Sequence, residues 1–144
     1  MNFQYRNLLI LFAFMSIALG CNSNKKEQQA LFEEVMLVHD EVMPKMGSLR
    51  ALSSELTQKA DSLMLDSLTD HSSKINEMRD LSKKLKDANE GMMEWMRQFD
   101  QVEEGTPHGE VIQYLNEQRK QIQKVRDDMI NSKEEAEKYL LDNN

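Results

Sequence analysis

Cys21 is the only cysteine in the 144-residue sequence, so its thiol cannot form a disulfide within the chain. It follows an apolar run over residues 8–20, with Arg6 ahead of that run and a polar stretch, residues 22–27, behind it. A positively charged start, a short apolar core and small residues before a cleavage site are typical of a secretory signal peptide. The apolar run is also shorter than the roughly 20 residues that a membrane-spanning helix needs. We therefore expect residues 1–20 to be removed.

The residues directly before the thiol, Ala18-Leu19-Gly20, resemble the lipobox of bacterial lipoproteins. In that motif the cysteine is diacylated and becomes the first residue of the mature chain. The sequence departs from the usual pattern in one detail, because its leucine stands two positions before the cysteine and not three. The resemblance implies a lipid anchor at Cys21, followed by a flexible tether over residues 21–27.

Methionine and histidine form a second set of chemically distinctive residues. Thioether and imidazole groups are soft ligands that suit Cu(I), and spacings of three or four residues place side chains on one face of a helix. The candidate ligand-binding residues are His39, Met43, Met46, Met92, Met96 and His108. Methionine is also a flexible filler of irregular cores. Packing is the favoured interpretation of this pattern, and we predict neither a bound metal nor a cofactor.

No catalytic motif is present in the sequence. It contains no Gly-rich phosphate loop, no Gly-x-Ser-x-Gly and no His-Glu-x-x-His. The carboxylate pairs Glu33–Glu34 and Asp127–Asp128 are adjacent in sequence, so on a helix they point to different faces and cannot work as an acid–base pair. We therefore expect this protein not to be an enzyme.

The charge balance excludes one class of partner. Lys and Arg total 18 against 25 Asp and Glu, for a net charge of −7, and loss of residues 1–20 removes only Arg6. An acidic mature chain is a poor match for the phosphates of nucleic acid. It is an equally poor match for anionic lipid.

The elements that must position these residues are long helices. The sequence is 30% charged and has only two prolines and five glycines, and its apolar residues recur every three or four positions. We predict helices at about 28–66, 73–103 and 107–140, with the first kinked near Pro44 because proline lacks the amide hydrogen that an α-helix needs. The predicted fold is all-α: an antiparallel up-down-up three-helix bundle over residues 28–141.

A turn near residue 70 would pair positions on the first two helices whose numbers total about 139. Under that pairing His39 lies near Asp100, with Glu110 of the third helix also within reach. Trp95 takes an inner position in the most regular apolar repeat, beside the methionines.

Three segments carry a resemblance to a known group of proteins. Residues 38–46 (VHDEVMPKM), 88–96 (ANEGMMEWM) and 124–129 (KVRDDM) resemble small lipoproteins of the Bacteroidota, some of which carry the label "viral A-type inclusion protein". The resemblance covers nearly all of the mature chain and implies attachment to the outer membrane, but it brings no active residues. The acidic stretch that would resemble the surface-export signal of that phylum is missing after Cys21, which favours the periplasmic face.

The sequence therefore predicts a membrane-anchored helical lipoprotein of the cell envelope. The favoured role is a structural or protein-interaction module that binds another envelope protein. The alternative is a lipoprotein that binds a small ligand or Cu(I) through the Met/His layer.

Overall fold

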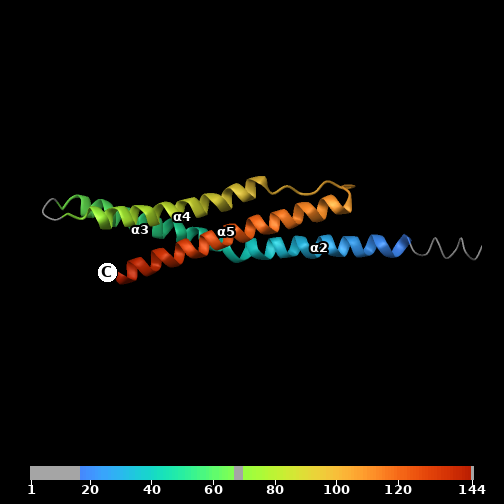
Figure 1. Ribbon diagram of the computed structural model, residues 1–144, viewed down its shortest axis with the longest axis horizontal. Helices are drawn as coiled ribbons and strands as arrows, with labels where there is room; N and C mark the ends of the chain where they lie inside the picture. The colour runs from blue at the N-terminus through green and yellow to red at the C-terminus, as the bar shows by residue number, and fades with distance from the viewer. Residues whose placement is uncertain (1–16, 67–69, 144) are drawn as a thin grey trace, which may run out of the picture.

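The computed structural model describes residues 17–66 and 70–143, with side chains described from Ser23 onward. Every element in these ranges is helical. They are α2 (Ile17–Val42), the 3-10 helix η1 (Met43–Lys45), α3 (Met46–Met64), α4 (Ser72–Gln98) and α5 (His108–Asp142). Figure 1 shows them lying lengthwise beside one another in an elongated body. The prediction of an all-α fold of long packed helices is confirmed.

The chain changes its helical geometry at Pro44. The single 3-10 turn η1 separates α2 from α3, and Pro44 lies inside it. Proline has no amide hydrogen to donate to the carbonyl of Asp40. Within the turn, the Met46 amide bonds instead to the carbonyl of Met43, three residues back. The Lys45 side chain donates to the carbonyl of Glu41.

The core runs along the faces where the helices meet. α3 packs against α4, α2 packs against α5, and α4 also packs against α5. The side chains with no exposed surface are apolar and come from every α-helix: Val35, Val42, Leu49, Leu56, Ala60, Leu85, Met92, Ile122, Met129 and Ala136. These residues belong to the three-four repeats of the sequence, so the periodic stripes form the core.

Two predicted boundaries differ from the structure. The backbone of residues 21–27, expected to be a flexible tether, is part of α2. α4 ends at Gln98, five residues before the predicted end, and Phe99 takes an extended conformation. The Tyr114 hydroxyl accepts a hydrogen bond from the Asp100 amide and donates one to the Asp100 carbonyl, each 2.9 Å long. This side chain therefore satisfies backbone groups that a longer helix would have satisfied.

Ion pairs join α2 to α5 along their exposed sides. Arg119 Nη1 lies 2.6 Å from Glu34 Oε2, and Arg126 Nε lies 2.8 Å from Glu41 Oε2. The hydrogen bond from Arg126 holds the pKa of Glu41 below its ordinary value. A carboxyl with a lowered pKa adds stability above its unfolded pKa, and that contribution is lost as the pH falls through the folded pKa.

We predict that Arg126→Gln raises the pKa of Glu41 toward its ordinary value, because the amide removes the positive charge. The pKa is measured by NMR titration of the Glu41 carboxyl carbon. The matched control is Lys124→Gln, since Lys124 pairs with Asp128 on its own helix. An unchanged Glu41 titration in Arg126→Gln would show that the pair does not form in solution.

Candidate functional site

The candidate lipid anchor, Cys21, lies within the backbone of α2. Its side chain and residues 1–16, which hold most of the predicted signal peptide, are outside the part that the structure describes. Among the described helices, none is both long and apolar enough to cross a membrane. Acylation of Cys21 stays a prediction.

The four candidate methionines have different environments. Met46 and Met92 are buried in the core. Met96 is partly buried against the core, whereas Met43 is 42% exposed. Two of the four methionine side chains are therefore core residues. Within the described residues, no group of three or more His, Cys, Asp or Glu side chains could hold a metal ion.

His39 has a different partner from the one predicted. Its Nδ1 lies 2.8 Å from Oδ1 of the neighbouring Asp40, and its ring centre lies 5.7 Å from that of Trp95. The expected partners Asp100 and Glu110 are not the ones it bonds, so that prediction is wrong. The physical reason is the register of the helices, which sets His39 beside Trp95 and leaves Asp100 beyond the end of α4.

His108 begins α5 and contacts the start of the described side chains of α2. Gln28 Nε2 donates to His108 Nδ1 over 3.1 Å, and His108 Nε2 lies 3.2 Å from Glu27 Oε2. His39 lies eleven residues beyond Gln28, or about 16 Å along α2 at the rise of an α-helix. The two candidate histidines therefore lie at separate places along α2, and His108 does not share one site with His39.

An aromatic stack surrounds Trp95, as its place in the apolar repeat indicated. Its ring lies 4.8 Å from that of Phe99, which lies 6.2 Å from both Phe32 and Tyr114. Trp95 is buried, and its indole Nε1–H has no hydrogen-bond partner. These contacts account for Trp95 as a packing residue between α4 and α2, and Phe99 extends the stack to Tyr114 of α5.

The hydroxyls of Ser53, Thr57 and Ser82 form a cluster that the apolar repeats do not predict. Ser53 and Ser82 are buried, their hydroxyls lie 2.9 Å apart, and Thr57 Oγ1 lies 2.9 Å from Ser82 Oγ. The sequence feature that could have indicated this cluster is Ser53, a polar residue at a position of the apolar repeat. The cluster lies beside a groove between α3 and α4, whose cations Arg50 and Lys86 carried no signal in the sequence.

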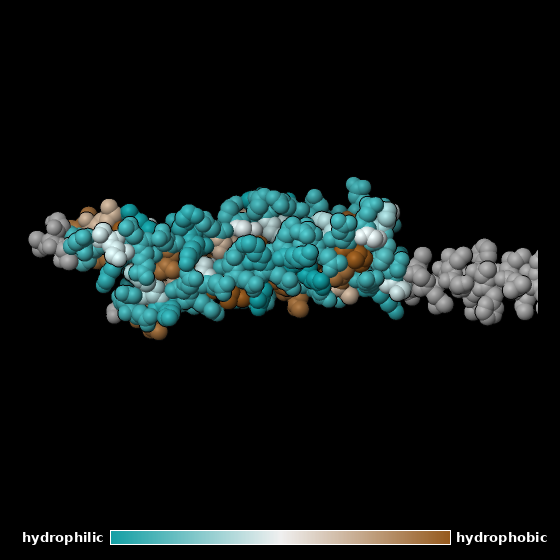
Figure 2. Space-filling view, viewed as in Figure 1, coloured by the Kyte–Doolittle hydropathy of each residue, from teal (hydrophilic) through white to brown (hydrophobic). Residues whose placement is uncertain are grey.

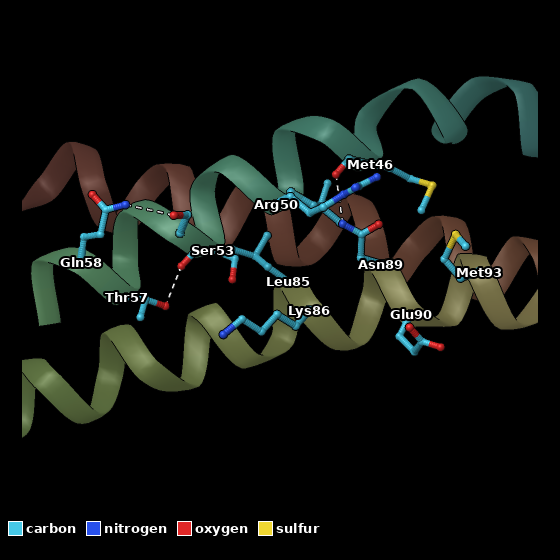
Figure 3. Close-up of a pocket in the computed structure, with 12 residues that line it drawn as sticks. Met46, Arg50, Ser53, Thr57, Gln58, Leu85, Lys86, Asn89, Glu90 and Met93 are labelled. Atoms are coloured by element: carbon cyan, nitrogen blue, oxygen red, sulfur yellow. Dashed lines mark hydrogen bonds between the residues drawn. The ribbon is translucent and has the colours of Figure 1, made fainter. Parts of the chain in front are cut away.

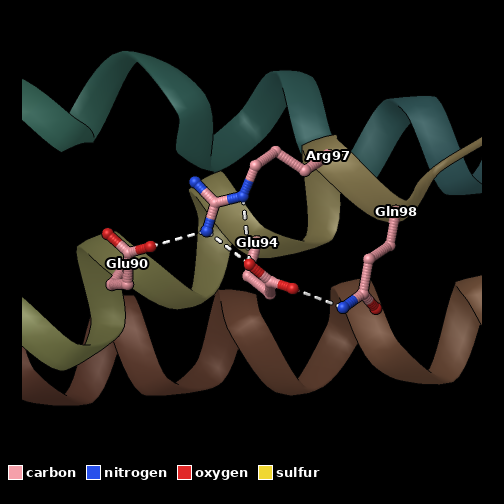
Figure 4. Close-up of polar contacts among 4 residues, drawn as sticks. All are labelled: Glu90, Glu94, Arg97 and Gln98. Atoms are coloured by element: carbon pink, nitrogen blue, oxygen red, sulfur yellow. Dashed lines mark hydrogen bonds and ion pairs between the residues drawn. The ribbon is translucent and has the colours of Figure 1, made fainter.

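Ion pairs account for much of the exposed surface near the end of α4. Arg97 pairs with Glu90 and Glu94, and Gln98 donates to Glu94 (Figure 4). The guanidinium holds the pKa of Glu94 below its ordinary value. All four side chains lie on α4, so this network supports its own helix.

Comparison with known proteins adds no assignment. No protein-family model, no curated protein and no solved structure matches this chain.

The separation of the two histidines and the burial of Met46 and Met92 lead to a prediction about copper. We expect Cu(I), added under reducing conditions, to leave the thermal melting curve unmoved. A site present only in the native state would add about 2.7 kcal/mol of stability at a hundredfold excess over Kd. The measurement is repeated on the double variant Met43→Leu/Met96→Leu. Leucine keeps the apolar volume, at a cost in stability below about 1.5 kcal/mol for a core residue, but it cannot bind copper. A copper-dependent rise in Tm that this double variant abolishes would establish the metal-binding alternative.

Proposed function

We propose that this protein is a lipid-anchored helical module of the bacterial cell envelope that binds another envelope protein. The observation that carries the anchor is the apolar run ending in Gly20-Cys21. Diacylation of the Cys21 thiol would hold the helical body at a membrane surface without a spanning helix. The resemblance to Bacteroidota lipoproteins favours the outer membrane, and the residues that follow Cys21 favour its periplasmic face.

The proposed body is an up-down-up bundle with its first helix bent at Pro44. The numbering of the contacts supports this arrangement. Met46 bonds to Asn89 and Ser53 to Ser82, so contacts between α3 and α4 proceed in opposite sequence directions. Both ion pairs between α2 and α5 join residues 85 positions apart, a constant offset that parallel helices produce.

The proposed binding role is supported by apolar side chains left on the surface. Phe32 and Leu37 of α2 are 38% and 71% exposed, and Met93 of α4 is 41% exposed. Figure 2 shows apolar areas of this kind among a mostly hydrophilic surface. Methionines are adaptable contact residues because their side chains are flexible and polarisable. Two of the exposed side chains near the middle of the body, Met43 and Met93, are methionines.

The test is photo-crosslinking in the native envelope. A photoreactive residue replaces Leu37 in one strain and Met93 in a second, and replaces the exposed Lys120 of α5 in a control strain. We expect a discrete crosslinked protein from the first two positions that is absent from the third. No discrete product from either apolar position, or the same products from Lys120, would contradict the interaction role.

A further inference from the structure

A groove of about 650 Å³ follows the contact between α3 and α4. Figure 3 shows Met46 and Met93 toward one end of it and Thr57 and Gln58 toward the other. The twelve-residue step from Met46 to Gln58 spans about 18 Å at the helical rise. This volume lies within the range of about 300–1,000 Å³ that small-molecule sites occupy.

The floor of the groove suits an apolar chain. Leu49 and Leu85 are buried beneath it, and the thioether of Met93 is partly exposed at its end. The hydroxyls of Ser53 and Thr57 are already bonded, to Ser82 and to backbone carbonyls. Satisfied hydroxyls do not require a polar ligand, so an alkyl chain can lie over them without leaving a buried donor unpaired.

The sides of the groove carry two cations, Arg50 on α3 and Lys86 on α4. Each residue lies between the same two cross-helix contacts, Met46–Asn89 and Ser53–Ser82. In Figure 3 the Arg50 side chain points toward the Met46 end of the groove and the Lys86 side chain toward the Thr57 end.

Arg50 differs from the other arginines in the described part of the chain. Arg79, Arg97, Arg119 and Arg126 each pair with a carboxylate. Arg50 has no such partner there, although the chain has an excess of acidic residues. The one carboxylate that lines the groove, that of Glu90, is bonded to Arg97. A guanidinium without a counterion beside the groove, with a second cation on the facing helix, favours an anion at this site.

We propose that this groove binds a single-chain carboxylate amphiphile, such as a medium-chain fatty acid. The carboxylate head binds Arg50, with Lys86 adding positive charge from the facing helix, and the alkyl chain lies over Leu49 and Leu85. A stable protein interface buries about 800 Å² on each partner. The surface that lines this groove is much smaller than that, so the groove favours a ligand of this size over a protein helix. This proposal goes beyond the protein partner proposed above, although Met93 belongs to both surfaces.

The test uses the protein as extracted from its native membrane, placed in phospholipid nanodiscs, and a dodecanoic acid that carries a photoreactive diazirine in its chain. Crosslinked peptides are mapped by mass spectrometry. We expect labelling within residues 46–58 and 85–93, and competition by unmodified dodecanoate. Arg50→Gln and Lys86→Gln should each reduce this labelling up to about fivefold, the range of a solvent-exposed ion pair. Lys83→Gln is the matched control, because Lys83 is exposed on α4 and pairs with Asp87.

A dodecanol probe with the same diazirine tests the role of the head group, and we expect it to label the groove less than the acid does. Equal labelling by the alcohol, equal labelling of the two glutamine variants and the wild type, or labelling mainly outside the groove would overturn the proposal. A photoreactive residue at Lys86 is the last arm. Capture of a protein chain there that excess dodecanoate does not displace would assign the groove to a protein and overturn the proposal as well.

Discussion

Replacing Trp95 by alanine is expected to lower the free energy of unfolding by about 3–5 kcal/mol, the usual cost of removing a large buried aromatic side chain. The indole is buried and stacks on Phe99, with the His39 ring on another side. Truncation would leave a cavity between α4 and α2. The measurement is urea unfolding of residues 23–144 followed by far-ultraviolet circular dichroism, with the slope of the transition compared between variants.

Trp95→Phe separates packing from hydrogen bonding in this experiment. Phenylalanine keeps much of the apolar contact of the indole. It also removes the buried Trp95 Nε1–H, which donates no hydrogen bond to the described residues. We therefore expect Trp95→Phe to lower the free energy of unfolding much less than Trp95→Ala does. A loss below about 1 kcal/mol in Trp95→Ala would place the ring at the surface and refute the assigned register of α4.

The second large effect concerns the anchor. Cys21→Ser is expected to abolish incorporation of radiolabelled palmitate and to release the protein from the membrane fraction. A hydroxyl in place of the thiol cannot form the thioether to diacylglycerol on which the lipoprotein signal depends. Ser23→Ala is the matched control, since it changes a neighbouring small residue and leaves the cysteine in place. Retention of both label and membrane association in Cys21→Ser would refute lipidation at this residue.

The helices could be predicted from the sequence because their apolar residues recur with helical spacing. The stripe through Met78, Leu81, Leu85, Met92 and Trp95 is the buried face of α4. Each of these residues contributes to the core by position alone, so no knowledge of its partner was needed. The interruption near Pro44 followed from a different local property, the missing amide hydrogen of proline, and a 3-10 turn separates α2 from α3 there.

The pairing between helices could not be predicted to the residue. No glycine or proline marks the connection between the first two predicted helices, so its centre was placed near residue 70. An error of two residues in that centre moves every opposed pair by four, about one helical turn. Hence His39 lies beside Trp95 and not near Asp100. The end of α4 depended on the Tyr114 hydroxyl, a contact fourteen residues away that periodicity does not encode.

For the candidate site too, local patterns could be predicted from the sequence, whereas properties that depend on helix pairing could not. Repeats of three and four placed the methionines on helix faces, but they could not distinguish the buried Met92 from the exposed Met43. The groove cations Arg50 and Lys86 come from different helices, so their placement beside one groove depends on the register. The lipid anchor, in contrast, is a local motif and needs no tertiary information.

Intact-mass spectrometry of the protein extracted from its native membrane tests the lipid anchor most directly. The predicted mass is that of residues 21–144 with a diacylglyceryl group on Cys21, with or without a further acyl chain on its amino group. Fragmentation should place the lipid on the first residue. The mass of an unmodified chain, or an N-terminus at any residue other than Cys21, would contradict the account.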